Sequence, residues 1–229
     1  MSAPTLPPEL FDFFRELAVH NDREWFAENK ERYEAQVKGP LLDFINGFAP
    51  KLNAISPQIV ADSRPNGGSM FRIYRDTRFS KDKTPYKTHA ALQFRHAAGK
   101  DVHAPGFYLH LEPDSVFMGA GLWRPETKYA NAIREAILEA PERWKKATRK
   151  KSFADKFELR GESLKRRPKM VDTDDHPLIE DLKRKDFIAV HDFDAAEALQ
   201  SNFLSTFAAR CRVASDFMSF LCEAVELEY

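Results

Sequence analysis

The pattern of apolar positions changes period twice and divides the chain into three blocks. From about residue 9 to residue 54 apolar residues recur at helical spacing, as in Leu10, Phe11, Phe14 and Leu17. From about 68 to 123 apolar and polar residues alternate, which is typical of half-buried strands. From 125 to 227 the helical period returns. Strands in one run between two helical runs predict an α+β fold, with helices packed on one face of an antiparallel sheet of about four or more strands.

Two helix starts are predicted from capping residues. Asn21 with Glu24, and Asp194 with Glu197, both have the spacing of a capping box. We expect the first pair to open a helix that Pro40 interrupts, and the second pair to open one long C-terminal helix. The residues of that helix predicted to face the core are Phe203, Phe207, Cys211, Phe217 and Leu221.

Each predicted strand has one apolar face and one functionalised face. Three alternating runs cover 70–79, 89–95 and 107–112, a weaker fourth ends in a bend near Gly119 and Gly121, and 186–190 forms a short additional strand. If the strands are neighbours, their polar faces merge into one patch. That patch consists of Arg72, Tyr74, Asp76, Arg78, His89, Gln93, Arg95, Tyr108, His110 and Glu112.

The residue types of this patch point to ligand binding. Arginine, tyrosine and histidine together suit fixed contacts with an anionic or aromatic ligand. The basic loop 80–87 follows the first run, and loops beside a rigid sheet are common ligand sites. A plain solvent-exposed strand face explains the same residues equally well. The residues expected to bind an anionic small ligand, for example a phosphorylated one, are Arg72, Tyr74, Arg78, Lys83, Tyr86, Lys87 and Tyr108.

Arg75 breaks the alternation, because it shares a face with Phe71 and Ile73. A buried arginine requires a carboxylate partner, and Asp76 and Asp82 are the nearby acids. We therefore expect a structural role for Arg75 and Asp76, and an internal polar network is an alternative explanation of the whole segment.

Catalytic chemistry is only weakly indicated. The candidates for acid/base work are His110, Glu112 and Asp76. His89 would add a third candidate metal ligand to His110 and Glu112, but the three residues come from two predicted strands and show no closed coordination pattern, so no metal site is predicted. The sequence specifies no cofactor and leaves open whether the protein is an enzyme.

Charge is unevenly distributed although the formal net charge is zero. Residues 143–169 hold 12 basic and 3 acidic residues, whereas residues 170–229 hold 5 basic and 13 acidic ones. The simpler interpretation is that the two segments pack together and neutralise each other. The alternative function is a non-catalytic nucleic-acid or protein interaction module that uses 143–169, with Trp144 stacking on bases.

Length and composition set the remaining expectations. A chain of 229 residues with 43% hydrophobic residues can form one core, so a single domain over 1–229 is predicted. No stretch approaches the roughly eighteen apolar residues of a membrane span, and no signal-peptide pattern is present, so we expect a cytoplasmic protein without a membrane partner. Cys211 and Cys222 are expected to be small buried hydrophobes and not a disulfide.

Residues 72–87 resemble the signature of a bacterial family known as domain of unknown function 2461. The matching positions are Arg72, Arg75, Asp76, Arg78, Phe79, Lys83, Pro85, Tyr86 and Lys87. The likeness extends through 20–26, 105–108, 121–123, 164–166, 175–177 and 182–187, with Met170 where a glycine is expected. The resemblance implies one full-length domain with 72–87 as its hallmark, and it implies no activity.

Overall fold

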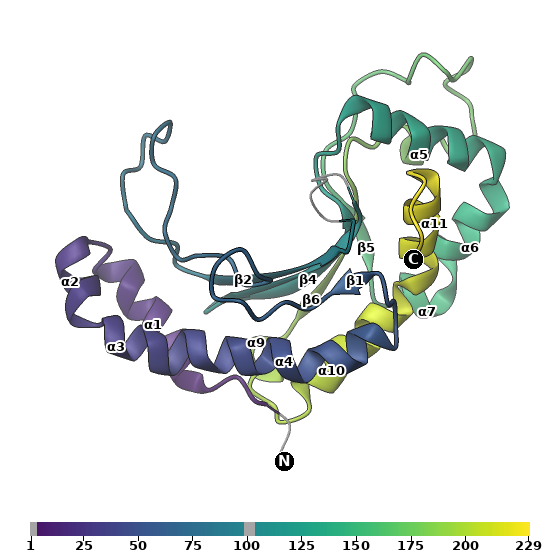
Figure 1. The fold of residues 1–229 in the computed structure, drawn as a ribbon. Helices are drawn as coiled ribbons and strands as arrows, with labels where there is room; N and C mark the ends of the chain where they lie inside the picture. The colour runs from purple at the N-terminus through teal and green to yellow at the C-terminus, as the bar shows by residue number, and fades with distance from the viewer. Residues whose placement is uncertain (1–3, 99–103) are drawn as a thin grey trace.

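The structure is a computed structural model that describes residues 4–98 and 104–229, with a six-stranded antiparallel sheet at its centre (Figure 1). The strands are β1 Ile59–Val60, β2 Ala90–His96, β3 Gly106–Glu112, β4 Ser115–Leu122, β5 Glu158–Arg160 and β6 Phe187–Phe193. Their order across the sheet is β1-β2-β3-β4-β6-β5. The helices are α1 Pro8–Val19, α2 Arg23–Glu28, α3 Lys30–Arg32, the π-helical turn η1 Tyr33–Lys38, α4 Gly39–Asn53, α5 Thr127–Glu139, α6 Pro141–Arg149, α7 Lys151–Ala154, α8 Ile179–Leu182, α9 Ala195–Ala198, α10 Phe203–Val213 and α11 Ser215–Ala224. The predicted α+β class is confirmed.

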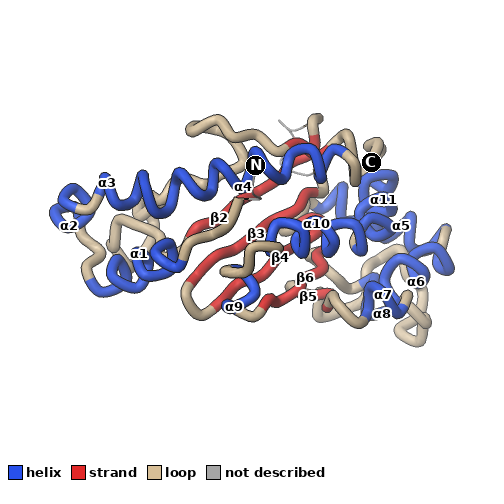
Figure 2. The backbone as a smooth tube through the Cα atoms, turned by 90° about the horizontal axis from the view of Figure 1, so that it is seen from below, coloured by secondary structure: helices blue, strands red, loops and turns tan. Residues whose placement is uncertain are grey.

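Helices α1, α4 and α10 lie along one face of the sheet, as the view from below shows (Figure 2). Phe48 of α4 and Phe207 of α10 both meet Phe94 of β2, with ring centroids 4.8 Å and 5.9 Å away. The strand residues predicted to be apolar here are buried, namely Ala90, Leu92, Phe94, Phe107, Leu109 and Leu111. Because side chains alternate along a strand, this packing directs the polar residues of β2 and β3 to the opposite face.

The far end of the sheet carries a second group of helices, α5, α6, α7 and α11 (Figure 1). Trp144 of α6 is fully buried there, with its ring centroid 5.2 Å from Phe220 and 5.8 Å from Phe217. Trp25 is half-buried and packs against the core, whereas Trp123 is 67% exposed.

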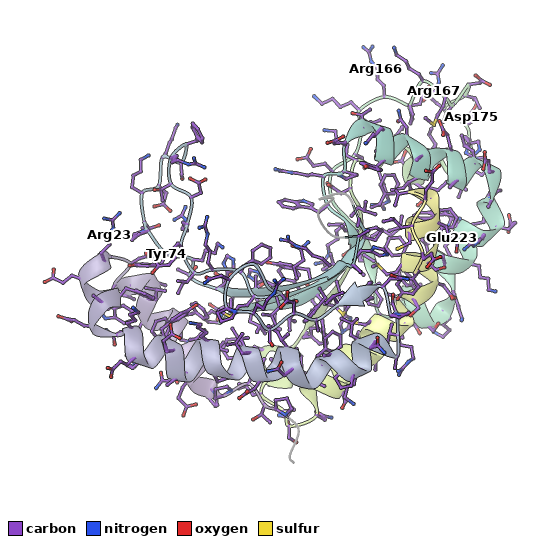
Figure 3. All side chains as sticks on the ribbon, viewed as in Figure 1. Arg23, Tyr74, Arg166, Arg167, Asp175 and Glu223 are labelled. Atoms are coloured by element: carbon purple, nitrogen blue, oxygen red, sulfur yellow. The ribbon has the colours of Figure 1, made fainter. Side chains whose placement is uncertain are left out.

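The basic helix α6 lies beside the acidic helix α11. Arg143 pairs with Glu223, which is labelled in Figure 3, and Lys150 approaches Asp216 at 3.8 Å. Arg149 pairs with Asp181 at 3.0 Å. These pairs support the interpretation that the basic and acidic segments neutralise each other.

Several predicted element boundaries are corrected. The cap of α2 is Asp22 and not Asn21, because Asp22 accepts a hydrogen bond from the amide of Trp25 at 2.9 Å. A π-helical turn directly precedes Pro40, whose ring clashes with the preceding turn of a regular helix. Asp194 and Glu197 do form a capping box, but the helix they open ends at Ala198, and α10 and α11 follow as separate helices.

The segment 70–79 is not a regular strand, contrary to the prediction. The segment follows the edge of β2, where Met70 and Leu92 form an isolated β-bridge. The amide of Phe71 donates a hydrogen bond to the carbonyl of Ala91 at 2.9 Å. Beyond a second bridge between Tyr74 and Tyr86 the chain leaves the sheet as a loop. Phe79, which lies in this loop, is 96% exposed.

The predicted short strand at 186–190 is confirmed and extends to Phe193. It pairs with β4, and Gly121 of β4 lies tightly against the backbone of Phe187 in β6. A Cβ atom on Gly121 would lie 2.1 Å from the carbonyl oxygen of Phe187, and the φ of +119° also favours glycine.

Both cysteines, Cys211 and Cys222, are buried and free, as predicted. Burial raises the pKa of Cys222 to about 12, so its thiol stays protonated at neutral pH. Within the described residues, no helix combines the length and the apolar character needed to cross a membrane.

Candidate functional site

The sheet face that points away from α1, α4 and α10 carries a group of polar and aromatic side chains. Within the described residues no helix lies across the centre of this face (Figure 1). Because residues two apart point to the same side, the register of β2, β3 and β4 places this group together. We call it the open face; it comprises Gln93, Arg95, Tyr108, His110, Glu112 and Phe117.

His110 is the centre of the open face. It lies opposite Ala91 on β2 and Phe117 on β4. The Phe117 ring stacks on the imidazole, with a centroid distance of 4.6 Å and an angle of 16°. The small side chain of Ala91 leaves room on the other side, and the ring of His89 approaches His110 to 4.4 Å.

A line of hydrogen bonds connects the polar residues of β3. The hydroxyl of Tyr108 lies 3.0 Å from Nδ1 of His110, and Nε2 of His110 lies 3.3 Å from Oε2 of Glu112. Thr88 Oγ1 donates to the other oxygen of Glu112 at 3.2 Å. With its proton on Nε2, His110 accepts from Tyr108 and donates to Glu112, so both of its nitrogens are satisfied.

Burial determines the charge state of these groups. Desolvation, with a smaller effect of His110, lowers the pKa of His89 to about 4, and desolvation also lowers the pKa of His110 although Glu112 opposes it. Burial raises the pKa of Tyr108 to about 12. At neutral pH the open face and the adjacent His89 therefore present two uncharged imidazoles and a protonated phenol, which suits proton acceptance or metal ligation.

Cationic groups gather around the ring of Phe71. Lys87 Nζ lies 5.4 Å and Arg95 Cζ lies 6.0 Å from the centroid of this ring, and the ring of Tyr108 is 6.3 Å away. The side chain of Arg72 is near enough that, after burial, its charge further lowers the pKa of Lys87. We call Phe71, Arg72, Lys87 and Arg95 the Phe71 cation cluster.

The hydrogen bonds of this cluster go to neutral groups. Lys87 Nζ donates to the carbonyl of Arg72 at 2.7 Å, and Arg95 Nε donates to the side-chain oxygen of Gln93 at 3.1 Å. In the ranges 4–98 and 104–229, no carboxylate pairs with Arg72, Lys87 or Arg95. The charge of the cluster is thus not neutralised by the described part of the chain.

The outer part of the signature is paired internally. Arg78 binds Asp76 at 2.7 Å, and these hydrogen bonds lower the pKa of Asp76 to about 2. Arg75 pairs with Asp82 at 2.5 Å and also contacts Thr84, so its partner is Asp82 and not Asp76. Asp76 is consequently an ionised partner of Arg78, which argues against its acid/base role.

Other predicted ligand contacts lie away from the open face. Lys83 Nζ donates to the carbonyl of Thr77 at 2.8 Å in the loop. Tyr86 is buried, with its ring stacked on Phe26 at 4.2 Å, and Asn21 exchanges two hydrogen bonds with the Tyr86 backbone. Tyr74 lies at the base of the loop, where its ring meets Phe26 at 6.3 Å (Figure 3). Only Arg72, Lys87 and Tyr108 of the predicted ligand-binding set therefore converge.

A separate depression of about 870 Å³ lies beside α5. Its basic lining consists of Arg124, Arg134, Lys165, Arg166, Arg167, Lys169 and Lys185, and Glu162 and Asp186 also line it. Figure 3 shows Arg166 and Arg167 at the far edge of this part of the molecule. The depression thus contains the C-terminal part of the basic stretch, Lys165, Arg166, Arg167 and Lys169.

A comparison with known protein families matched most of the chain. A family model described as "Conserved hypothetical protein (DUF2461)" matches residues 9–220. The chain belongs to DUF2461. No curated protein and no solved structure matched the chain. The resemblance seen in residues 72–87 is therefore confirmed for most of the chain.

The candidate site also contains residues that were not in the predicted ligand-binding set. Phe71 was expected on the apolar face, but it lies between Lys87, Arg95 and Tyr108. Arg95 and Gln93 were part of the predicted patch but not of the predicted ligand set. Gln93 and Arg95 can be assigned to the site only from the register of β2 against β3, in which Gln93 lies opposite Tyr108.

Proposed function

We propose that this DUF2461 protein binds a small anionic molecule, phosphorylated or carboxylated, on the open face beside the Phe71 cation cluster. The observation that supports this is the convergence of Arg72, Lys87 and Arg95 without a carboxylate partner in the described residues. Cations that are brought together and left unneutralised are stabilised by an anion, and charge-assisted hydrogen bonds to phosphate or carboxylate are among the strongest available.

Each residue of the cluster has a distinct role in this proposal. Lys87 and Arg72 supply positive charge at the edge of the sheet, and Arg95 supplies a planar fork for two oxygens of one anionic group. Tyr108, protonated at neutral pH, can donate or accept a hydrogen bond to the uncharged part of the ligand. The proposal concerns binding and assigns no reaction.

A thermal-shift screen with matched variants tests the proposal. The ligands are inorganic phosphate, pyrophosphate, sugar phosphates, nucleotides and dicarboxylates at low ionic strength. A ligand at about 100 times its Kd should stabilise the native state by roughly 2.7 kcal/mol and raise Tm accordingly. Lys87→Gln combined with Arg95→Gln should abolish the shift, because the cluster then keeps only one cation.

The control removes the same charge from the outer loop. Arg78→Gln combined with Lys83→Gln changes the net charge equally, but both side chains lie in the exposed loop and are paired internally. This double variant should keep the ligand response. Equal loss of the shift in both double variants, or no shift with any anion in the wild type, contradicts the proposal.

The second candidate function is nucleic-acid binding at the depression beside α5. It is favoured by Arg124, Lys165, Arg166 and Lys169, for which the described chain provides no carboxylate partner. Base stacking by Trp144 is not part of it, because that ring is buried. Oligonucleotide affinity that falls steeply with salt, and that Lys165→Gln/Arg166→Gln reduces, would support this function over the first.

We also propose a cytoplasmic location. It is supported by the two free, buried thiols of Cys211 and Cys222, which fit a reducing compartment. Fractionation of cells that express the chain tests it, and recovery of the protein outside the cytoplasmic fraction would contradict it.

A further inference from the structure

Three side chains at one end of the open face have the composition of a metal site. One ring nitrogen each of His89 and His110 and one carboxylate oxygen of Glu112 all lie within 4.8 Å of one another. We propose that these three residues bind a first-row divalent transition-metal ion such as Zn²⁺. Around tetrahedral Zn²⁺, with bonds of about 2.0–2.2 Å, ligand atoms lie roughly 3.4 Å apart, so small side-chain rotations would complete the site.

The sheet register brings the three ligands together from two strands. His110 and Glu112 are two residues apart on β3 and therefore share a face. Ala90, the first residue of β2, pairs with Leu111, so His89, one residue earlier, lies where the antiparallel register continues to the position opposite Glu112. His89 fits beside His110 because the residue opposite His110 is Ala91, whose side chain is small.

The surroundings hold two of the three ligands, His110 and Glu112, in orientation. The hydroxyl of Tyr108 at Nδ1 leaves Nε2 of His110 directed at Glu112, and metal-bound histidines usually have such a partner on the second nitrogen. Phe117 fixes the plane of the His110 ring by stacking. Thr88 holds one oxygen of Glu112 and leaves the other oxygen on the side of His110.

The ligand set defines the class of ion. Imidazole ligands favour Zn²⁺, Co²⁺, Ni²⁺ or Fe²⁺ over Mg²⁺ and Ca²⁺, which prefer oxygen ligands. Three protein ligands leave at least one position for water or for a bound molecule, as in catalytic and not structural zinc sites. This inference goes beyond anion binding, because metal binding at these residues requires neither a bound anion nor the Phe71 cation cluster.

Calorimetric titration of the tag-free, chelator-treated full chain with Zn²⁺, Co²⁺ and Mg²⁺ tests the site. We expect one Zn²⁺ per chain, visible d–d absorption bands with Co²⁺, and no binding of Mg²⁺. His89→Gln and Glu112→Gln should each weaken Zn²⁺ binding at least tenfold and change the Co²⁺ spectrum. Tyr108→Phe, which removes the partner of a ligand, should weaken it by roughly tenfold.

The controls separate this site from adventitious histidine binding and from the anion proposal. His20→Gln removes an exposed histidine at the C-terminal cap of α1 and should leave Zn²⁺ affinity unchanged. Lys87→Gln/Arg95→Gln should abolish anion binding but retain the metal, so the two proposals fail independently. His89 and Glu112 are partly exposed, and unchanged urea unfolding of their variants shows that the fold is intact. No stoichiometric Zn²⁺ binding, or equal Zn²⁺ affinity in wild type, His89→Gln and Glu112→Gln, overturns the inference.

Discussion

Trp144→Ala should lower the free energy of unfolding by about 3–5 kcal/mol, as is usual for a large aromatic side chain removed from a core. The ring is fully buried among Phe187, Phe217 and Phe220, and these residues cannot fill the space that it leaves. Urea unfolding followed by far-UV circular dichroism measures the change.

Trp123→Ala provides a matched control on the same residue type. Its side chain is 67% exposed and contacts mainly the guanidinium of Arg124, 4.8 Å from the ring centroid. The loss should be less than about 1 kcal/mol, the scale of an exposed cation–π contact. If Trp144→Ala leaves stability unchanged but abolishes oligonucleotide binding, then Trp144 is a surface stacking residue and the assignment of α6 to the core is wrong.

Gly121→Ala should destabilise the protein by about 2–5 kcal/mol, through backbone strain and overpacking between β4 and β6. The new Cβ would lie 2.1 Å from the carbonyl oxygen of Phe187, so the two strands would have to separate locally. The φ of +119° adds a conformational cost for any residue with a side chain. Thermal and urea unfolding measure the loss.

Gly119→Ala is the control in the same strand. The nearest atom to a Cβ at this position is the Cβ of Tyr108, at the ordinary contact distance of 3.7 Å, and its φ lies outside the left-handed region. This variant should keep the wild-type stability within about 1 kcal/mol. A similar loss of stability in both variants would show that the close contact between β4 and β6 at Gly121 is not the reason why glycine is needed there.

The sequence predicted the central strands because one face of each is fully buried. In β2 and β3 the alternation of large apolar residues with polar ones left little ambiguity. The same alternation at 70–79 led to a wrong strand prediction. This segment follows the edge of the sheet through isolated β-bridges, so its side chains alternate although no continuous hydrogen-bond ladder forms. Periodicity reports which side of the chain is apolar, and long-range hydrogen bonding decides whether a strand forms.

The composition of the site was partly predictable, but its geometry was not. Tyr108, His110 and Glu112 were identified together because they alternate on one strand. Their relation to His89 depends on the β2–β3 register, which sequence spacing does not give, and this is why a metal site was not predicted. The Phe71 cation cluster depends on residues from the edge segment and from β2, which only the fold brings together.

The sequence also did not determine which neighbouring charged side chains form ion pairs with each other. Arg75 and Asp76 are adjacent, but successive side chains in an extended segment point in opposite directions. Asp76 therefore binds Arg78 on its own side, and Arg75 reaches Asp82 across the loop. The signature residues 75–84 thus stabilise the loop internally, whereas Arg72 and Lys87 at its two ends have no carboxylate partner among the described residues.

The central claim is that the Phe71 cation cluster binds an anion, and locating a bound anion tests it most directly. Crystals of the full chain soaked with selenate, an analogue of phosphate and sulfate, would be measured at the selenium absorption edge with a sulfur-methionine protein. The account predicts an anomalous peak within hydrogen-bonding distance of Lys87 Nζ and the Arg95 guanidinium, and its absence in Lys87→Gln/Arg95→Gln. Selenate found only at the depression beside α5 or at the 75–84 loop, with no peak beside Phe71, would contradict it.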